Sequence, residues 1–239
     1  MAMPCLSNRP LYLQVRDILA ERIAAGEWKI NSAIPNECDL AREYNVSPGT
    51  MRKALDLMES QHLVTRHQGR GTFVTDQGSD QLSNRFWRIR TGNGAPVTSK
   101  VEETKIIRDL ASKAERERLL LGTEDLVFRI RAVRFREDRP FMVEDVSLPA
   151  ALFPGLLNKS SVSPGIMVLA QQHGLLVGKG EERLTIDAAC QELADDLGIA
   201  PATPVMVLDR LMVTLDETPI EWRVGRCHLA GEFYLAELR

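Results

Sequence analysis

Residues 46–74 contain the feature that most constrains the fold of this chain: a short amphipathic helix pattern followed at once by a glycine-containing hairpin pattern. Two alternating segments, 63–66 and 72–74, flank a turn at 67–71, which is typical of a β-hairpin. The helix pattern places one apolar face, at α-helical spacing, on Met51, Ala54, Leu55 and Met58. The residues before this segment then decide which motif it completes.

A proline at the start of this helix could break it or begin it. Ser47 is a good N-cap residue, and Pro48 then falls at the first helical position. There the missing N–H of proline costs nothing, and its fixed φ suits the helix. We therefore expect Pro48 to begin the helix.

Two further helix patterns precede it. The first has apolar residues at a 3.6-residue period over residues 11–23 and stops at Gly26. A short turn and a strand are expected over residues 28–34. Asn36 is then an expected N-cap, with Asp39 in a loose capping-box arrangement, and a second helix follows.

Three helices followed by a hairpin predict a winged helix-turn-helix domain over residues 9–75. Such a helix fits the major groove of DNA, and the residues near its N-terminus reach the bases. A winged helix that contacts proteins, with its charges solvated, is the alternative. The candidate DNA-binding residues lie on the third helix and the hairpin: Ser47, Gly49, Thr50, Arg52, Lys53, His67, Gly69, Arg70 and Gly71.

Residues 76–84 are polar and lack apolar periodicity, so we interpret them as an interdomain linker. Residues 85–239 predict an α+β domain, with a capping box at Ser112 and Glu115 and a C-cap at Gly198. The expected strands lie at 97–107, 126–136, 141–148, 183–188, 205–215 and 219–229, and the expected helices lie near 111–121, 163–173 and 190–197.

This second domain contains a weak internal repeat. Arg131 lies nine residues before Pro140, and Arg210 lies nine residues before Pro219. Each pair spans a strand, an acidic turn and a return strand. The pattern fits two related hairpins, and it fits equally the ordinary pattern of antiparallel sheets.

The composition excludes several function classes. The 239 residues are 44% hydrophobic and 26% charged, as in an ordinary soluble globular protein. No apolar run approaches the roughly 18 residues of a membrane span, and the N-terminus has no signal-peptide pattern. The four cysteines are dispersed, which favours a reducing cytoplasm, and neither they nor the four histidines have metal-ligand spacing. We expect no metal, no cofactor and no membrane partner. Because the net charge is −3, any basic surface must be local.

A series of positions resembles the DNA-binding domain of GntR-type bacterial repressors: Pro10-Leu11-Tyr12, Gly26, Pro35, Glu37, Leu40-Ala41, Val46-Ser47, Thr50, Arg52, Ala54-Leu55, Gly69 and Gly71-Thr72-Phe73-Val74. The resemblance implies that the first domain binds DNA. Two positions depart from the family pattern, because Cys38 and Pro48 stand where the family usually has operator-reading arginines. Each lost bidentate arginine should change base discrimination by roughly 1–3 kcal/mol.

Motifs across the second domain resemble the UTRA effector-binding domain of HutC-type GntR regulators: LVFRIRAVRFREDRPFMVEDVSLP (126–149), FPGL (153–156), EERLTIDAA (181–189) and PVMVLDRLMVTLDETPIEW (204–222). The resemblance implies a chorismate-lyase-like α+β fold around an antiparallel sheet. It also implies a small-molecule pocket between the sheet and the helices.

Charged residues on strands usually belong to a solvated face, but this resemblance turns several into effector-binding candidates: Arg134, Glu144, Ser163, Glu221 and Arg223. Glu144 and Glu221 match positions that bond polar groups, and Arg134 matches one suited to an acidic group. Ser163 heads a helix whose N-terminus suits an anion. The family often has a second arginine at Ala132 and a tyrosine at Cys227. The loss of that arginine makes a carboxylate or a less charged ligand more plausible than a phosphate.

The leading hypothesis is a cytoplasmic, bacterial transcriptional repressor that a small polar or anionic effector releases from its operator. A homodimer would match a pseudo-palindromic operator. A lyase-like enzyme with an accessory DNA-binding domain is the alternative, although the sequence offers no nucleophile–base pair. An activator, or a regulator without an effector, also stays open.

Overall fold

The computed structural model describes residues 9–79, 86–158 and 165–236 of the chain. The chain divides into two compact units. One comprises residues 1–79 with 174–176, and the other comprises residues 80–173 with 177–239. Within the described ranges no helix is long and apolar enough to cross a membrane.

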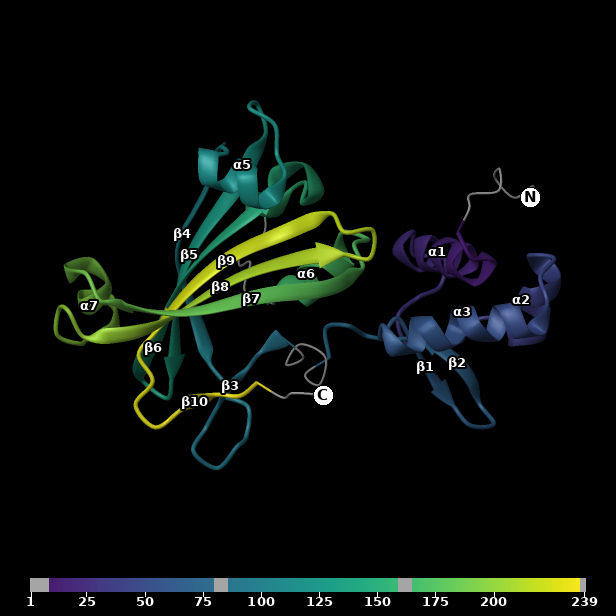
Figure 1. The fold of residues 1–239 in the computed structure, drawn as a ribbon, viewed down its shortest axis with the longest axis horizontal. Helices are drawn as coiled ribbons and strands as arrows, with labels where there is room; N and C mark the ends of the chain where they lie inside the picture. The colour runs from purple at the N-terminus through teal and green to yellow at the C-terminus, as the bar shows by residue number, and fades with distance from the viewer. Residues whose placement is uncertain (1–8, 80–85, 159–164, 237–239) are drawn as a thin grey trace. The chain divides into compact units, whose positions relative to one another are not determined.

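The first unit is a winged helix-turn-helix, as the sequence predicts (Figure 1). Its elements are α1 (Leu11–Ala24), α2 (Glu37–Glu43), α3 (Pro48–Ser60), β1 (Val64–His67) and β2 (Gly71–Val74). Strands β1 and β2 pair antiparallel, with Val64 opposite Val74. The three helices bury apolar side chains, which include Val15, Leu19, Leu40, Met51, Leu55 and Met58.

The expected start of α3 is confirmed. The Ser47 hydroxyl accepts a hydrogen bond from the Thr50 N–H at 3.1 Å, and Pro48 is the first helical residue. The Asn36 cap of α2 is confirmed in the same way, through the Asp39 N–H at 3.0 Å. The Asp39 carboxylate does not complete a capping box, because its contact is with the Asn36 side-chain amide.

Of the short turn and strand expected over residues 28–34, the turn is present at residues 30–31, but the strand is wrong. Only Ala33 forms an isolated bridge, to Phe73. The Asn31 and Ile34 N–H groups donate to the Val74 and Thr72 carbonyls, both at 2.9 Å. Asn31 has a φ of 61°, which turns the chain out of an extended conformation. The segment therefore touches β2 without continuing as a strand.

The second unit is built on one six-stranded antiparallel sheet in the order β4-β5-β6-β9-β8-β7 (Figure 1). Its strands are β4 (Lys100–Leu110), β5 (Leu126–Arg136), β6 (Arg139–Pro149), β7 (Val177–Ala188), β8 (Pro204–Thr214) and β9 (Pro219–Cys227). The short strands β3 (Ile89–Arg90) and β10 (Phe233–Tyr234) form a separate pair that the sequence did not predict.

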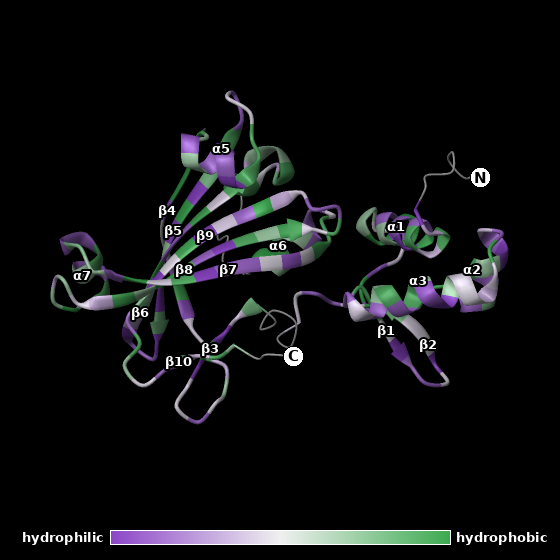
Figure 2. Ribbon diagram, viewed as in Figure 1, coloured by the Kyte–Doolittle hydropathy of each residue, from purple (hydrophilic) through white to green (hydrophobic). Residues whose placement is uncertain are grey.

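Helices cover both faces of this sheet. On one face lie α5 (Lys113–Leu119) and α7 (Gln191–Leu197), which pack on Val127 and on Val143 of the sheet respectively. On the other face lies α6 (Gly165–Gln172), which is hydrophobic over most of its length (Figure 2). Along β9 buried and half-buried residues alternate from Glu221 to Cys227, because successive side chains point to opposite faces.

The internal repeat is present in the topology. The first half runs β4–α5–β5–β6 and the second runs β7–α7–β8–β9, and β6 and β9 meet at the centre of the sheet. When the start of β5 is aligned with the start of β8, Ala132 and Arg210 occupy equivalent positions of the two repeats. The sequence spacing had instead matched Arg131 with Arg210. The difference of one residue matters because it moves a side chain to the other face of the sheet.

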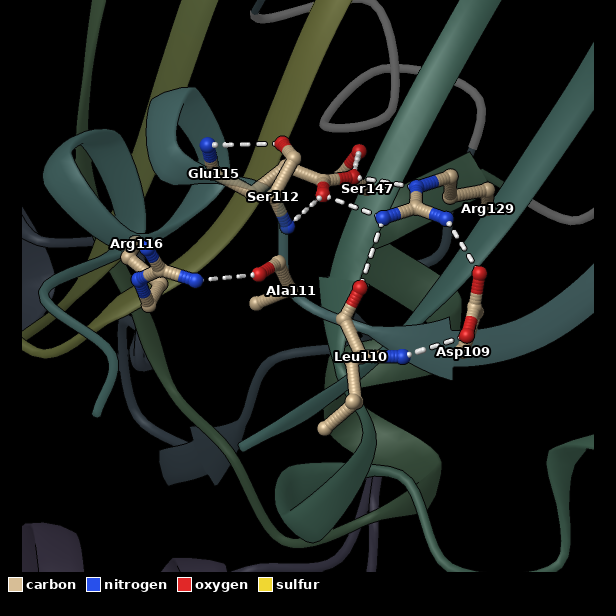
Figure 3. Close-up of polar contacts among 8 residues, drawn as sticks. All are labelled: Asp109, Leu110, Ala111, Ser112, Glu115, Arg116, Arg129 and Ser147. Atoms are coloured by element: carbon tan, nitrogen blue, oxygen red, sulfur yellow. Dashed lines mark hydrogen bonds and ion pairs between the residues drawn. The ribbon is translucent and has the colours of Figure 1, made fainter. Parts of the chain in front are cut away.

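Glu115 connects α5 to the sheet through hydrogen bonds of its carboxylate (Figure 3). The capping box predicted at Ser112 and Glu115 is present, with the Ser112 N–H donating to the Glu115 carboxylate at 2.7 Å. The Arg129 guanidinium donates two further hydrogen bonds to this carboxylate, at 2.8 and 2.7 Å, and the Ser147 hydroxyl donates a fourth at 2.8 Å. One buried carboxylate thereby joins α5, β5 and β6.

Candidate functional site

The N-terminal half of α3 presents an exposed polar surface. Ser47, Gly49 and Lys53 are exposed, and Thr50 is half-buried. The Ser47 and Thr50 hydroxyls lie 2.9 Å apart, so each is oriented by the other. A Cβ on Gly49 would meet only the Ser47 Oγ, at 3.9 Å, so packing within the unit does not require a glycine there.

Arg52 is held in place by α2. Its Nε and one terminal nitrogen donate to the Glu37 carboxylate at 3.3 and 2.7 Å, while 64% of its side chain stays exposed. These hydrogen bonds use two of the five guanidinium donors, so three remain for another acceptor. The hydrogen bonds with Glu37 also raise the pKa of Arg52, which is therefore charged at any physiological pH.

The hairpin places the remaining candidates at the tip of the wing. His67, Arg70 and both glycines are exposed. Gly69 and Gly71 have φ values of 72° and 109°, in the region that favours glycine. The His67 ring lies edge-on to Phe73 at 5.2 Å, which fixes the base of the turn. Arg66, just before the turn, instead bonds Asp56 of α3 and is not a free cation.

The second unit encloses a charged cavity between the sheet and α6. Its volume is about 70 Å³. Four of the five effector candidates line it, namely Arg134, Glu144, Glu221 and Arg223, and Ser163 lies outside the described residues. The other walls are the apolar side chains of Val101, Ile130, Ala132, Val146, Leu148, Ile166 and Leu169.

The charged residues of this cavity form a paired cluster. Glu144 bonds Arg134 at 2.7 Å and Arg223 at 3.3 Å. Burial disfavours the charged form of Glu144, but the two guanidinium groups outweigh it, and the pKa of Glu144 lies below its usual value. Glu221 accepts two hydrogen bonds from Arg210, at 3.2 and 2.8 Å.

Glu182 of β7 completes the cluster. It accepts hydrogen bonds from Arg223 at 3.4 Å and from the Tyr234 hydroxyl at 2.9 Å. Three arginines then face three glutamates, so the cluster is electrically neutral. The Nε atoms of Arg134 and Arg223 are buried, and neither has a hydrogen-bond partner among the described residues. Two buried donors of the cluster thus have no hydrogen-bond partner among the described residues.

Both domains match known family models. The gntR family of bacterial regulatory proteins matches residues 11–74, and the UTRA domain matches residues 88–230. The chain is a GntR-family transcriptional regulator with a UTRA domain. It therefore binds DNA and is not an enzyme.

Relatives of this GntR regulator share most of its length. The repressor MngR of the mannosyl-D-glycerate transport and metabolism system in Escherichia coli K12 is 28% identical over 94% of this chain and 88% of its own. The HTH-type transcriptional repressor NagR of Bacillus subtilis 168 is 27% identical over 89% of this chain and 88% of its own.

Solved structures agree with the fold. The ligand-binding domain of a proposed GntR-family regulator from Bordetella bronchiseptica superposes with a TM-score of 0.60 at 26% identity, over 65% of this chain and 98% of that one. PhnF from Mycobacterium smegmatis superposes with a TM-score of 0.58 at 20% identity, over 94% of this chain and 99% of that one. The second of these supports the fold alone.

Sequence reasoning missed Arg210 and Glu182 of this GntR regulator. Arg210 occupies the position in the second repeat that Ala132 occupies in the first, and both line the same cavity. Arg210 of β8 thus supplies the cavity with a guanidinium, whereas Ala132 of β5 supplies none. The one-residue error in the repeat alignment concealed this, because Arg131 lies on the other face with Asp145 and Asp196.

Proposed function

We propose that this regulator is a homodimeric repressor in the bacterial cytoplasm that binds a pseudo-palindromic operator and leaves it when a small polar or weakly anionic effector enters the charged cavity. The surface of α3 supports the first part of the proposal. Its N-terminus combines the backbone N–H of Gly49, the oriented hydroxyls of Ser47 and Thr50, and the prepositioned Arg52, all of which suit phosphates and base edges.

Each group in this DNA-binding surface has a role. The free donors of Arg52 suit a guanine edge or a phosphate. Lys53 and Arg70 supply positive charge to the backbone, and Gly49, Gly69 and Gly71 let the chain approach the duplex closely. Because Pro48 and Cys38 are both exposed and offer no charged donor, the operator should differ from those read through arginines at these positions.

An operator-binding experiment tests this part. Fragments selected from a random library by the full-length protein should be retarded at low salt, and Arg52→Ala should weaken retardation by at least about tenfold, or 1.4 kcal/mol. Arg108→Ala removes an exposed arginine from β4 and serves as the matched control. Equal affinities of both variants and the wild type would exclude α3 as the reading helix.

The cavity supports the second part of the proposal. The neutral cluster does not need a dianion, and the unpaired Nε donors of Arg134 and Arg223 suit one or two acceptor oxygens, such as those of a carboxylate. The apolar wall suits a short hydrocarbon portion. A ligand of usual size needs about 300 Å³ or more, so binding must move the lining apart. That movement would couple the cavity to the arrangement of the DNA-binding domains.

A thermal-shift screen of small carboxylates, sugar acids and phosphates tests the ligand. A true effector at about 100 times its Kd adds roughly 2.7 kcal/mol to the unfolding free energy. Arg134→Ala should abolish this shift and the release of the operator. Arg131→Ala removes an arginine from the opposite face of the same strand and should retain both. A shift that survives Arg134→Ala would place the effector elsewhere.

A further inference from the structure

Strand β7 forms one border of the six-stranded sheet, and its outer edge is unpaired among the described residues (Figure 1). It is 12 residues long and carries two exposed apolar side chains. Ile186 is 78% exposed and Leu184 is 42% exposed. A long edge strand with apolar side chains is a template for pairing with another strand, and natural proteins usually shield such an edge.

The apolar surface at this edge continues the interior of the unit. Leu184 and Ile186 lie opposite Leu208 and Met206 of β8. Leu208 belongs to the buried cluster around Trp87 and Phe141, and Met206 packs against that cluster. The core therefore extends along one face of the sheet as far as β7, where it ends uncovered.

The sequence of this edge is complementary to itself. Residues 183–187 read Arg-Leu-Thr-Ile-Asp, and all five are exposed. In an antiparallel pair of two copies centred on Thr185, Leu184 lies opposite Ile186 of the second copy. Arg183 then lies opposite Asp187 of the second copy. Directly opposed side chains of this kind stabilise an antiparallel pair, whereas like charges destabilise it.

Neighbouring registers lack this complementarity. A centre at Leu184 places Glu181 opposite Asp187 of the second copy, and a centre at Arg183 places that arginine opposite itself. A centre at Ile186 leaves Leu184 opposite Ala188 and pairs no opposite charges. The charge pattern thus selects Thr185 as the two-fold point.

The backbone has the correct alternation for this register. The Ala189 N–H donates to the Thr203 carbonyl at 2.9 Å, whereas the Ala188 N–H donates to its neighbour Asp187 at 2.8 Å. Backbone groups of alternate residues point to opposite sides of a strand. Those of Leu184 and Ile186 therefore point away from β8, as a hydrogen-bonded pair between these residues of two copies requires.

The other border of the sheet provides an internal comparison. Asp109 of β4 accepts from the Leu110 N–H at 2.8 Å, as Asp187 accepts from the N–H of Ala188, which aligns the ends of the two strands. In this alignment the exposed Arg108 takes the place of Ile186. The pairing of β4 with β5 also shifts register between Glu103 and Lys105. The charged Arg108 thus stands on β4 at the place where β7 has Ile186, whereas both border strands shift register once, β7 between Val177 and Lys179.

We propose that β7 is the dimerisation edge, and that it pairs antiparallel with β7 of a second copy about Thr185 to join two six-stranded sheets. The proposal rests on the proposed homodimer and adds the surface and the register. Its two-fold axis would relate the two DNA-binding domains as the two halves of a palindromic operator are related.

A single cysteine at the two-fold point tests the register. Thr185 and its copy form a non-hydrogen-bonded pair, whose Cα atoms lie about 4.5 Å apart, within disulfide reach. In a full-length background with Cys5, Cys38 and Cys190 replaced by serine, Thr185→Cys should cross-link into a covalent dimer under mild oxidation. Arg183→Cys is the control, because its two copies would lie roughly 13 Å apart. Equal cross-linking of both variants, or none at Thr185→Cys, would overturn the register.

Charge reversal tests the pairing itself. Arg183→Asp and Asp187→Arg each place like charges opposite one another, and each should raise the dimer dissociation constant at least about tenfold, measured by sedimentation at low salt. The double variant exchanges the charges and should return within about threefold of the wild type. A double variant as weak as the single ones would overturn the pairing.

The outcomes separate this surface from the proposed function. A wild-type dimer that retards the operator while Thr185→Cys does not cross-link places the interface elsewhere and leaves the repressor proposal standing. A protein that cross-links at Thr185→Cys but retards no selected DNA supports the β7 interface and contradicts the repressor proposal.

Discussion

At the scale of single residues, the structure separates groups that the fold needs from groups that only a ligand needs. Gly71 requires glycine because its φ is 109°. Gly49 does not, because its backbone is helical and a Cβ there would meet open space apart from Ser47. A glycine in a helix interior lowers stability by up to about 1 kcal/mol relative to alanine. No contact within the folded unit offsets this loss at Gly49.

Gly49→Ala should therefore raise stability and lower operator affinity. We expect a gain of up to about 1 kcal/mol in the unfolding free energy, and about a tenfold weaker operator complex, because a methyl group would hold the duplex away from α3. Urea unfolding and mobility shift measure the two quantities. Ser60→Ala at the far end of α3 should leave operator affinity unchanged. If Gly49→Ala binds as well as the wild type, the duplex does not approach this backbone.

Pro48→Arg should change base preference more than stability. Pro48 is exposed at the first helical position, where an arginine fits without a packing change. The new side chain adds a bidentate donor beside Arg52, worth roughly 1–3 kcal/mol at one base pair. Binding-site selection with both proteins measures the preference. An unchanged selected sequence would show that this position does not face the bases.

At the scale of elements, the sequence predicts helix caps with a clear local pattern well, and it predicts the ends of some strands poorly. The capping box of α5 and the Gly198 cap of α7 are confirmed, since both depend on local chemistry. Strand β7 begins at Val177, six residues before the expected start, because Gly178 and Gly180 suggest a loop. Gly178 is needed, because a Cβ there would lie 2.6 Å from the Thr214 carbonyl oxygen. Close backbone approach of this kind leaves no periodic signal.

The attachment of α5 should depend on pH through Glu115. Its burial opposes the charged form, but hydrogen bonds from Arg129, Ser112 and Ser147 outweigh this and lower its pKa from 4.5 to about 2. Because the folded-state pKa lies below the unfolded one, the stabilisation is complete above about pH 4.5 and is lost as the pH falls toward 2.

Glu115→Gln should cost at most about 3 kcal/mol at neutral pH, and its difference from the wild type should shrink as the pH is lowered from 5 to 2.5. Urea unfolding followed by tryptophan fluorescence measures both. Glu117→Gln is the control, since this carboxylate is 68% exposed and lies 3.9 Å from Lys113. A Glu115→Gln deficit that stays constant down to pH 2.5 would show that shape, not charge, holds α5.

At the scale of the whole molecule, the cavity could be predicted only in part. The resemblance to UTRA domains located four residues that line the cavity. It did not locate Glu182, which bonds Arg223 although it lies 41 residues away in the sequence. Antiparallel pairing brings such residues together, and no local pattern records it. The neutral charge of the cluster depends on residues from five strands, β5 to β9, and this balance is what argues against a dianionic effector.

The proposed two-fold dimer leads to the last prediction, because a rigid dimer would require a fixed distance and a fixed rotation between half-sites. Inserting 5 base pairs between the halves of a selected operator turns one half to the opposite side of the duplex, since one turn takes about 10–10.5 base pairs. We expect retardation to fall to that of an isolated half-site. An equal insertion outside the operator is the control. Operator affinity that ignores the spacing would mean that the two DNA-binding domains act independently, and release by an effector could not then work through their relative position.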